Sequence, residues 1–308
     1  MAFETPSQTA RSGDATIAGI RITHPDRVLF RDQGLTKLEL ARYYEAVAGR
    51  MLPFVENRLL SLVRCPQGRR KSCFYQKHAG DGFPDAIKRI DIEESSGRRA
   101  SYLYVTDIAG IIAACQMGTL EFHIWWSTID GLERPDRLVF DLDPDTSIGF
   151  GEVKRSAIEI RDRLADLGLH SFALVTGGKG IHVVVPLVAL AGGNEAKDFA
   201  EAFARKMVAD EPDRYTATMS KAKRKDRVFI DWLRNERGST AIAPYSTRAR
   251  AGGPVATPVS WDEVGSLTAA NLFHPADVLK RLDDDDPWAA AAGLRQSITK
   301  NMRETVQA

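Results

Sequence analysis

The feature that most constrains this chain is an apolar strand that ends in two aspartates, Arg137-Leu-Val-Phe-Asp141-Leu-Asp143-Pro144. Side chains alternate between the two faces of a strand, so Asp141 and Asp143 share one face while Phe140 and Leu142 share the other. Two neighbouring carboxylates repel each other and lose hydration, so they need a cation between them or contact with water. The run therefore predicts a divalent-cation site of the kind used in phosphoryl and nucleotidyl transfer. The alternative is a polar turn that Pro144 ends.

A third aspartate stands inside another apolar run, Phe229-Ile-Asp231-Trp-Leu. A buried carboxylate is costly, so it needs a partner, a proton or a metal ion. Together with Asp141 and Asp143 it predicts a metal site built from three carboxylates on two strands. For Asp231 alone, a salt bridge to a nearby arginine remains the alternative.

Between these strands lies the segment Thr176-Gly-Gly-Lys179-Gly-Ile-His182, flanked by apolar runs that predict a strand, a glycine turn and a second strand. Glycines let backbone N–H groups approach an anion, and Lys179 adds a charge suited to phosphate. The spacing is not that of a Walker A loop, and a strand follows where that loop requires a helix. A plain hairpin with a solvated Lys179 and a core histidine at His182 stay open as alternatives.

Two arginines follow Asp231 at strand spacing. Arg248 and Arg250 share one face if their segment is extended, which would make a clamp for phosphate oxygens. A solvated basic edge strand is the alternative. The basic run from Lys221 to Arg227 is either a solvated loop or one wall of a nucleic-acid channel.

The motifs, taken in order, resemble a known family. Asp-Leu-Asp-Pro, Thr-Gly-Gly-Lys-Gly-Ile-His, Phe-Ile-Asp-Trp and Ala-Pro-Tyr-Ser-x-Arg-x-Arg match the polymerase domain of bacterial ATP-dependent DNA ligase D, in the archaeo-eukaryotic primase superfamily. The resemblance extends from about Ala18 to about Leu282. It implies a two-lobed primase-polymerase fold and a DNA-directed nucleotidyltransferase. Such an enzyme fills gaps and extends 3′ ends, templated or untemplated, with ribo- or deoxynucleotides during non-homologous end joining.

The resemblance also implies roles for individual residues. The ligands of two divalent ions, manganese in preference to magnesium, would be Asp141, Asp143 and Asp231. The incoming NTP or dNTP would be bound by His123, Thr176, Lys179, His182, Arg248 and Arg250, and its base by Phe74 or Tyr75. A downstream 5′-phosphate would be bound by Arg27, Lys37 and Arg64. The primer, template or triphosphate would be contacted by Arg224 and Arg234.

Some of these positions have simpler readings from the residues alone. Thr36 is a suitable N-cap for a helix that begins at Lys37, whose ammonium group could be solvated. Phe74 and Tyr75 could belong to a core. The assignment of these residues to DNA or nucleotide binding therefore depends on the family resemblance.

The implied partners are double-stranded DNA ends and gaps with a 5′-phosphate, the end-binding protein Ku, and ligase and phosphoesterase domains of a longer parent chain. The sequence contains no Lys-x-Asp-Gly adenylation motif, so ligation would reside elsewhere. Three rival functions remain open. They are a replicative-type primase, a two-metal phosphoesterase or nuclease, and a non-catalytic DNA-end-binding adaptor.

Composition limits these choices only weakly. The chain has 42 basic and 41 acidic residues, so any nucleic-acid binding must come from local clusters of charge. The three cysteines form no Cys-x-x-Cys pair, which favours a reducing compartment and argues against a zinc ribbon. A zinc site from Cys65, Cys73 and His78 is conceivable, although the spacing matches no standard pattern. No apolar span of about 20 residues occurs, so no membrane association and a cytoplasmic, nucleoid-associated location are expected.

Periodicity predicts the organisation. We expect a linker or disordered tail at 1–17, an N-terminal α/β lobe at 18–130, a catalytic lobe at 131–253, and a tail with short helices at 254–308. In the catalytic lobe the strands and amphipathic helices follow a β-α-β-β-α-β order. That order predicts a ferredoxin-like, RNA-recognition-motif-like sheet flanked by helices.

Overall fold

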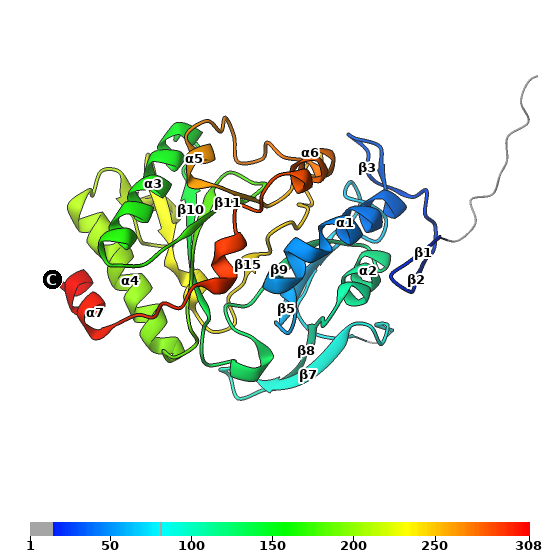
Figure 1. The fold of residues 1–308 in the computed structure, drawn as a ribbon, viewed down its shortest axis with the longest axis horizontal. Coiled ribbons are helices and arrows are strands. Elements are labelled where there is room, and N and C mark those ends of the chain that lie inside the picture. The colour runs from blue at the N-terminus through cyan, green and yellow to red at the C-terminus, as the bar shows by residue number, and fades with distance from the viewer. Residues whose placement is uncertain (1–14, 81) are drawn as a thin grey trace, which may run out of the picture.

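The computed structural model describes residues 15–80 and 82–308, which form two mixed α/β lobes (Figure 1). Most of the predicted tail, residues 1–14, lies outside the described residues. The rest of it differs from the prediction, because β1 (Ala15–Ile17) is a strand that pairs with β2 (Ile20–Ile22). A second small hairpin joins β3 (Val28–Phe30) to β4 (Leu35–Thr36).

The catalytic lobe has the predicted β-α-β-β-α-β core. Its elements are β10 (Arg137–Pro144), α3 (Phe150–Asp166), β11 (Phe172–Val175), β12 (Ile181–Pro186), α4 (Gly193–Asp210) and β14 (Val228–Asp231). The four strands lie in the order β14-β10-β12-β11, and each is antiparallel to its neighbour. This is the ferredoxin-like arrangement, so the predicted fold class is confirmed.

Two short strands complete this sheet. At one edge β13 (Tyr215–Thr216) runs parallel to β14, and at the other β16 (Thr257–Val259) pairs with β11. Because β16 follows residue 254, the first part of the segment predicted to be a tail belongs to the catalytic sheet. The same segment contains α7 (Lys300–Gln307), a helix with a Thr299 N-cap, as expected for a tail with short helices.

The alternation of β10 decides which face of the sheet carries chemistry. Leu138, Phe140 and Leu142 are fully buried beneath the helices, and the Phe140 ring lies 5.0 Å from that of Phe203 on α4. Burying a side chain of this size contributes about 1.5–3 kcal/mol. The strand is therefore held in one register, and Asp141 and Asp143 must lie on the opposite face.

The N-terminal lobe is a second sheet in the order β15-β9-β5-β8-β7, with β6 paired to β5. Its strands are β5 (Leu60–Arg64), β6 (Phe74–Gln76), β7 (Lys88–Glu93), β8 (Arg99–Tyr104), β9 (Thr119–Ile124) and β15 (Ala241–Ile242). The buried helices α1 (Lys37–Val55) and α2 (Ile108–Gln116) pack against it. The Thr36 N-cap is confirmed, because Thr36 and Glu39 form a capping box.

The chain crosses between the lobes more than once. Strand β15 comes from the segment predicted to be catalytic, yet it pairs with β9 of the N-terminal sheet. Figure 1 shows it between the two lobes. The remaining helices are α5 (Trp261–Val264), α6 (Pro275–Lys280) and the 3₁₀ turns η1 (Ile129–Gly131), η2 (Lys221–Lys223), η3 (Trp232–Asn235), η4 (Arg281–Asp283) and η5 (Ala289–Gly293).

The cysteines correct the sequence-based expectation. Cys65 and Cys73 are joined in a disulfide, and only Cys115 is a free thiol. The spacing of the cysteines does not reveal this pair. The two thiols meet because β5 and β6 are antiparallel partners and the loop between them turns back. His78 does not join them, since its Nε2 lies 3.0 Å from Glu94 Oε1. The conceivable zinc site is therefore not formed.

None of the helices within residues 15–80 and 82–308 is long and apolar enough to cross a membrane.

Asn235 supports β10 beside the aspartates. Strand β14 ends at Asp231, opposite Asp141, so the earlier part of β10 has no strand on that edge. The fully buried Asn235 amide takes its place: Oδ1 accepts from Val139 N at 2.7 Å, and Nδ2 donates to Val139 O at 2.8 Å. A side chain thus satisfies backbone groups that would otherwise be unpaired.

Replacing this amide should destabilise the fold. We expect Asn235→Ala to lower the free energy of unfolding by about 2–4 kcal/mol, because buried backbone groups lose their partners. Urea unfolding followed by circular dichroism measures it, with the exposed Asn271→Ala as the control. Equal stability of the two variants would contradict this role.

Candidate functional site

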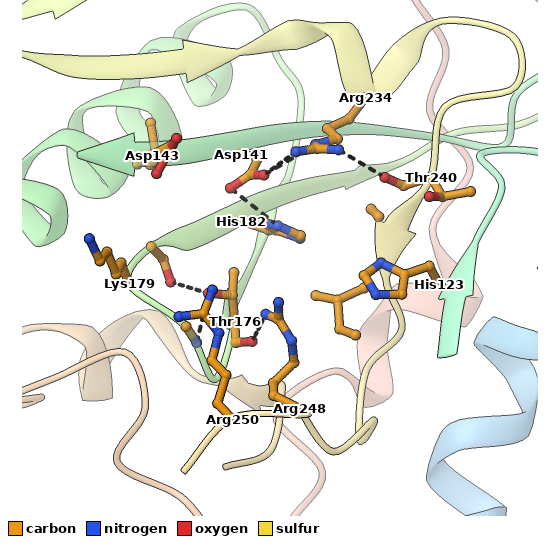
Figure 2. Close-up of a pocket in the computed structure, with 15 residues that line it drawn as sticks. His123, Asp141, Asp143, Thr176, Lys179, His182, Arg234, Thr240, Arg248 and Arg250 are labelled. Atoms are coloured by element: carbon orange, nitrogen blue, oxygen red, sulfur yellow. Dashed lines mark hydrogen bonds and ion pairs between the residues drawn. The ribbon is translucent and has the colours of Figure 1, made fainter. Parts of the chain in front are cut away.

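A cavity of about 230 Å³ opens between the two lobes (Figure 2). Its lining includes most of the residues predicted from the sequence, namely His123, Asp141, Asp143, Thr176, Lys179, His182, Arg234, Arg248 and Arg250. Figure 2 shows the aspartates on one side and the glycine turn with the two arginines on the other. Residues more than 100 positions apart are therefore brought to one place.

The carboxylate side follows from strand register. Asp141 lies directly opposite His182 on β12 and opposite Asp231 on β14. His182 Nε2 is 3.3 Å from Asp141 Oδ1. Asp143 lies two residues further along, on the same face. Asp231 is buried and does not line the cavity itself.

Two arginines neutralise these carboxylates. Arg234 Nη2 lies 3.1 Å from Asp141 Oδ2 and 3.1 Å from Asp231 Oδ2, so one guanidinium bridges both. Arg224 Nη1 lies 3.2 Å from Asp143 Oδ2, and its guanidinium covers the Phe229 ring at 3.7 Å. Both arginines, predicted to contact primer, template or triphosphate, touch the predicted metal ligands in this structure.

The pKa values follow these contacts. Burial alone would raise the pKa of Asp141, but His182 and Arg234 hold it well below its ordinary value. Burial and the charge of Asp141 raise the pKa of Asp143. Burial, with a further contribution from Asp141, also raises the pKa of Asp231, although Arg234 opposes this. The ionised Asp141 therefore makes its neighbours harder to ionise.

The donor set suits a hard divalent cation, although its geometry is not that of a loaded site. Carboxylate oxygens are the ligands such ions prefer, and the positions beside them attract positive charge. Within the described residues, however, no group of three or more His, Cys, Asp or Glu side chains is arranged to hold a metal ion. The cations beside the aspartates are the arginines. The predicted ligand set stays a prediction.

The glycine turn fits closely under β10. A Cβ at Gly180 would lie 1.9 Å from the Leu142 carbonyl oxygen, so a side chain there is excluded. Gly177 has φ +65°, and Thr176 Oγ1 donates to Gly180 O at 3.0 Å and accepts from Gly178 N at 3.2 Å. Thr176 thus shapes the turn, while Lys179 at its tip is exposed.

A residue not assigned from the sequence, Glu121, links the opposite wall. This buried carboxylate lies 2.8 Å from His123 Nε2 and 3.2 Å from Arg248 Nε, and it accepts from Ala249 N at 2.7 Å. Burial would raise its pKa, but these partners lower it to about 2. The spacing Glu121-x-His123 on one strand could have indicated the pair, because both side chains share a face.

Lys179 and Arg250 differ from Arg248. Arg248 Nη1 donates to Thr176 O at 2.6 Å, whereas the side chains of Lys179 and Arg250 have no hydrogen bond or ion pair within the described residues. Both are exposed at the cavity. They are the cations that remain available for an anionic ligand.

The aromatic pair is not in a core. Phe74 and Tyr75 are 47% and 54% exposed, which removes the core alternative. The Tyr75 ring lies 5.8 Å from that of His123, and its hydroxyl is 2.9 Å from Thr240 Oγ1. Tyr75 is thus the member that faces the cavity residues.

The residues predicted to bind a 5′-phosphate divide into two groups. Arg27 and Lys37 are adjacent, since Lys37 N donates to Arg27 O at 2.9 Å. Arg64 makes different contacts: its guanidinium donates to Gln76 Oε1 at 2.6 Å and Met117 O at 2.9 Å. Arg64 also lies over the Phe74 and Phe83 rings. Its hydrogen bond to Gln76 ties β5 to β6, and it stands two residues before Pro66, whose carbonyl oxygen accepts from Arg27 Nη1 at 2.8 Å.

Comparison with known proteins identifies this arrangement. A family model described as "LigD, primase-polymerase domain" matches residues 36–288. The chain belongs to this LigD primase-polymerase family.

Individual relatives agree with that assignment. The chain is 38% identical over 298 residues to "Multifunctional non-homologous end joining protein LigD" of Pseudomonas aeruginosa, covering 96% of this chain and 35% of that protein. It is 29% identical over 279 residues to "Bifunctional non-homologous end joining protein LigD" of Bacillus subtilis, covering 90% and 45%. The chain therefore spans less than half the length of these LigD proteins.

The fold of this chain also matches that of a solved polymerase domain of the LigD family. It is the "Polymerase Domain from Mycobacterium tuberculosis Ligase D in complex with DNA". The two structures superpose with a TM-score of 0.81 at 30% identity, covering 88% of this chain and 96% of that one.

The Glu121 link can be tested by its effect on His123. Burial lowers the pKa of His123, and the hydrogen bond and charge of Glu121 partly restore it. We expect Glu121→Gln to lower that pKa further, because the imidazolium loses its carboxylate. An NMR pH titration of the imidazole measures the change, with the exposed Glu304→Gln as the control. A raised or unchanged pKa in Glu121→Gln would contradict the link.

Proposed function

We propose that this chain is a DNA-directed nucleotidyltransferase that fills gaps and extends 3′ ends, templated or untemplated, during non-homologous end joining. Membership of the LigD primase-polymerase family supports this, and so do the names of its relatives. The proposed substrates are NTPs or dNTPs and DNA ends or gaps with a 5′-phosphate.

One observation carries the proposal. A single cavity has Asp141 and Asp143 on one side and Lys179, Arg248 and Arg250 on the other. A nucleoside triphosphate with divalent cations matches this division of charge, because its phosphates suit the cations and its metal ions suit the carboxylates. A nuclease acting on a phosphodiester has no need of the triphosphate-facing cations.

Asp141, Asp143 and Asp231 would hold two divalent ions, manganese in preference to magnesium. When bound, such ions activate the primer 3′-hydroxyl and neutralise charge on the phosphates as pyrophosphate leaves. Arg234 and Arg224 occupy the same carboxylates here and would compete with the ions for them. Arg248 and Arg250 would hold the triphosphate, with Tyr75 or Phe74 beneath the base.

DNA would reach the site across the N-terminal lobe. A terminal phosphate would be met by Arg27 and Lys37, whose side chains here donate to Pro66 O and Thr23 O. The Mycobacterium tuberculosis relative was solved with DNA, which supports DNA as the partner. Because the chain spans 35% of the Pseudomonas aeruginosa LigD protein, ligase and phosphoesterase domains of a longer chain and the protein Ku are further proposed partners. We place this function in the cytoplasm, at the nucleoid.

Primer extension tests the catalytic proposal. On a gapped duplex with a downstream 5′-phosphate and Mn²⁺, we expect extension with ribo- or deoxynucleotides. Asp141→Ala/Asp143→Ala should lower the rate by at least about a thousandfold, because the ions lose their ligands. Matched DNA binding by both proteins, followed by fluorescence anisotropy, shows that the variant is folded.

The rival functions give different results in the same assay. Synthesis of dinucleotides without a primer would indicate a replicative-type primase, and shortening of the primer would indicate a nuclease. Metal-independent DNA binding with no extension by the parent protein would leave the end-binding adaptor and reject the polymerase.

Lys37 should make recognition of the 5′-phosphate depend on pH. Burial lowers the pKa of Lys37 to about 8, and a bound phosphate favours its charged form. The preference for 5′-phosphorylated over 5′-hydroxyl DNA should therefore be strongest near about pH 7 and decline as pH rises through about 8. Anisotropy titrations at several pH values measure the preference. In Lys37→Arg, which stays charged, it should not change with pH.

A preference that is equally strong at about pH 6.5 and about pH 9.5 in the parent protein would exclude Lys37 from the phosphate site.

A further inference from the structure

We propose a second phosphate-binding site, formed by the loop from Cys65 to Cys73 together with strand β3, which holds the backbone of the duplex downstream of the gap. The proposal rests on the proposed function, because it assigns a further contact to the same DNA. The cations of this loop lie outside the sequence motifs that form the main cavity.

The site is a cavity of about 240 Å³ on the N-terminal lobe, and it shares no lining residue with the main cavity. Four cationic side chains line it, those of Arg31, Arg69, Arg70 and Lys71. The carboxylate that faces them is Asp32, whose two oxygens pair with Arg69 at 3.3 Å and Arg70 at 2.7 Å. The four cationic side chains therefore carry more positive charge than the Asp32 carboxylate can neutralise.

Part of this positive charge has no partner. Within residues 15–80 and 82–308, the side chains of Arg31 and Lys71 make no hydrogen bond or ion pair, and both are exposed. Arg69 Nε is buried and has no hydrogen-bond acceptor. A buried N–H without an acceptor is costly, so an anion at this position would remove an existing penalty.

The loop is held in shape before any ligand binds. The Cys65–Cys73 disulfide closes it, and Arg69 N donates to Leu29 O of β3 at 3.0 Å. Gly68, at φ +88°, approaches β3 so closely that a Cβ would lie 3.0 Å from Val28 O. A pre-ordered loop loses less entropy on binding than a mobile one.

The site adjoins the predicted 5′-phosphate residues. Arg27 Nη1 donates to Pro66 O in the loop at 2.8 Å, and Val28 and Leu29, the next residues, line the cavity. A strand whose terminal phosphate contacts Arg27 therefore has this loop beside it.

The lining favours a backbone over a base or a small molecule. Val28 and Leu29 are its apolar members, and among the described residues no aromatic side chain lines it on which a base could stack. Exposed arginine and lysine side chains along one edge suit a row of phosphates, which they bind without reading sequence.

The test removes two of the exposed cations, in Arg70→Ala/Lys71→Ala. The control Lys206→Ala/Lys300→Ala removes the same charge from α4 and α7 at the other end of the molecule (Figure 1). Binding is measured by anisotropy without nucleotide or metal ions. The DNA carries a downstream duplex of about 15 or about 3 base pairs, with a 5′-phosphate or a 5′-hydroxyl.

We expect Arg70→Ala/Lys71→Ala to weaken binding of the long downstream duplex about tenfold, with either 5′ end, and to lower the slope of log affinity against log salt by about 2. Binding of the short duplex and the behaviour of the control should not change. These results do not depend on catalysis, so failure of primer extension would leave them intact.

Three results would overturn the proposal. An effect seen only with the 5′-phosphate would assign the loop to the terminal phosphate. An equal effect in the control would indicate net charge alone, and no effect would exclude contact with DNA.

The exposed Cys73 gives a second, independent variant. Cys73→Ser removes the disulfide but keeps every cation, so binding of the long downstream duplex should weaken about threefold as the loop loses its order. Unchanged affinity, with the loss of the disulfide verified by mass, would show that the disulfide does not hold the site in shape.

Discussion

The direct opposition of Asp141 and Asp231 on antiparallel strands is the constraint on which the rest of the site depends. Like charges directly across a strand pair are destabilising, and burial adds to the penalty. Positive charge beside the pair offsets this penalty, because the Arg234 guanidinium contacts both carboxylates. The cations of the cavity are therefore as much a condition for the fold as a means of binding a ligand.

The same constraint explains why much of the site could be predicted from sequence. Asp141, Asp143 and Asp231 stand in apolar runs whose register is decided by local alternation, as it is for Phe140 beneath the helices. The β-α-β-β-α-β order then fixes which strands are neighbours. Local pattern and strand order were sufficient to bring these side chains together.

What could not be predicted depends on contacts between distant segments. Strands β15 and β16 have two and three residues, which are too few to show a periodic pattern in the sequence. The Glu121 link to Arg248 arises only when both lobes are folded, and the bridge made by Arg234 requires β14 to lie beside β10. The disulfide was hidden for a similar reason, because the loop between β5 and β6 decides which thiols meet. Each case is a tertiary contact with no signature in its own segment.

Strand β15 joins the N-terminal sheet, although the strands before and after it, β14 and β16, belong to the catalytic sheet. Neither sheet is consequently encoded by a continuous stretch of the chain. A fragment that ends at the predicted boundary near residue 130 would leave the N-terminal sheet without its edge strand β15. The catalytic sheet would then lack the wall of the cavity that the N-terminal lobe supplies. The two lobes therefore form one folding unit, and neither should keep its native sheet when it is produced alone.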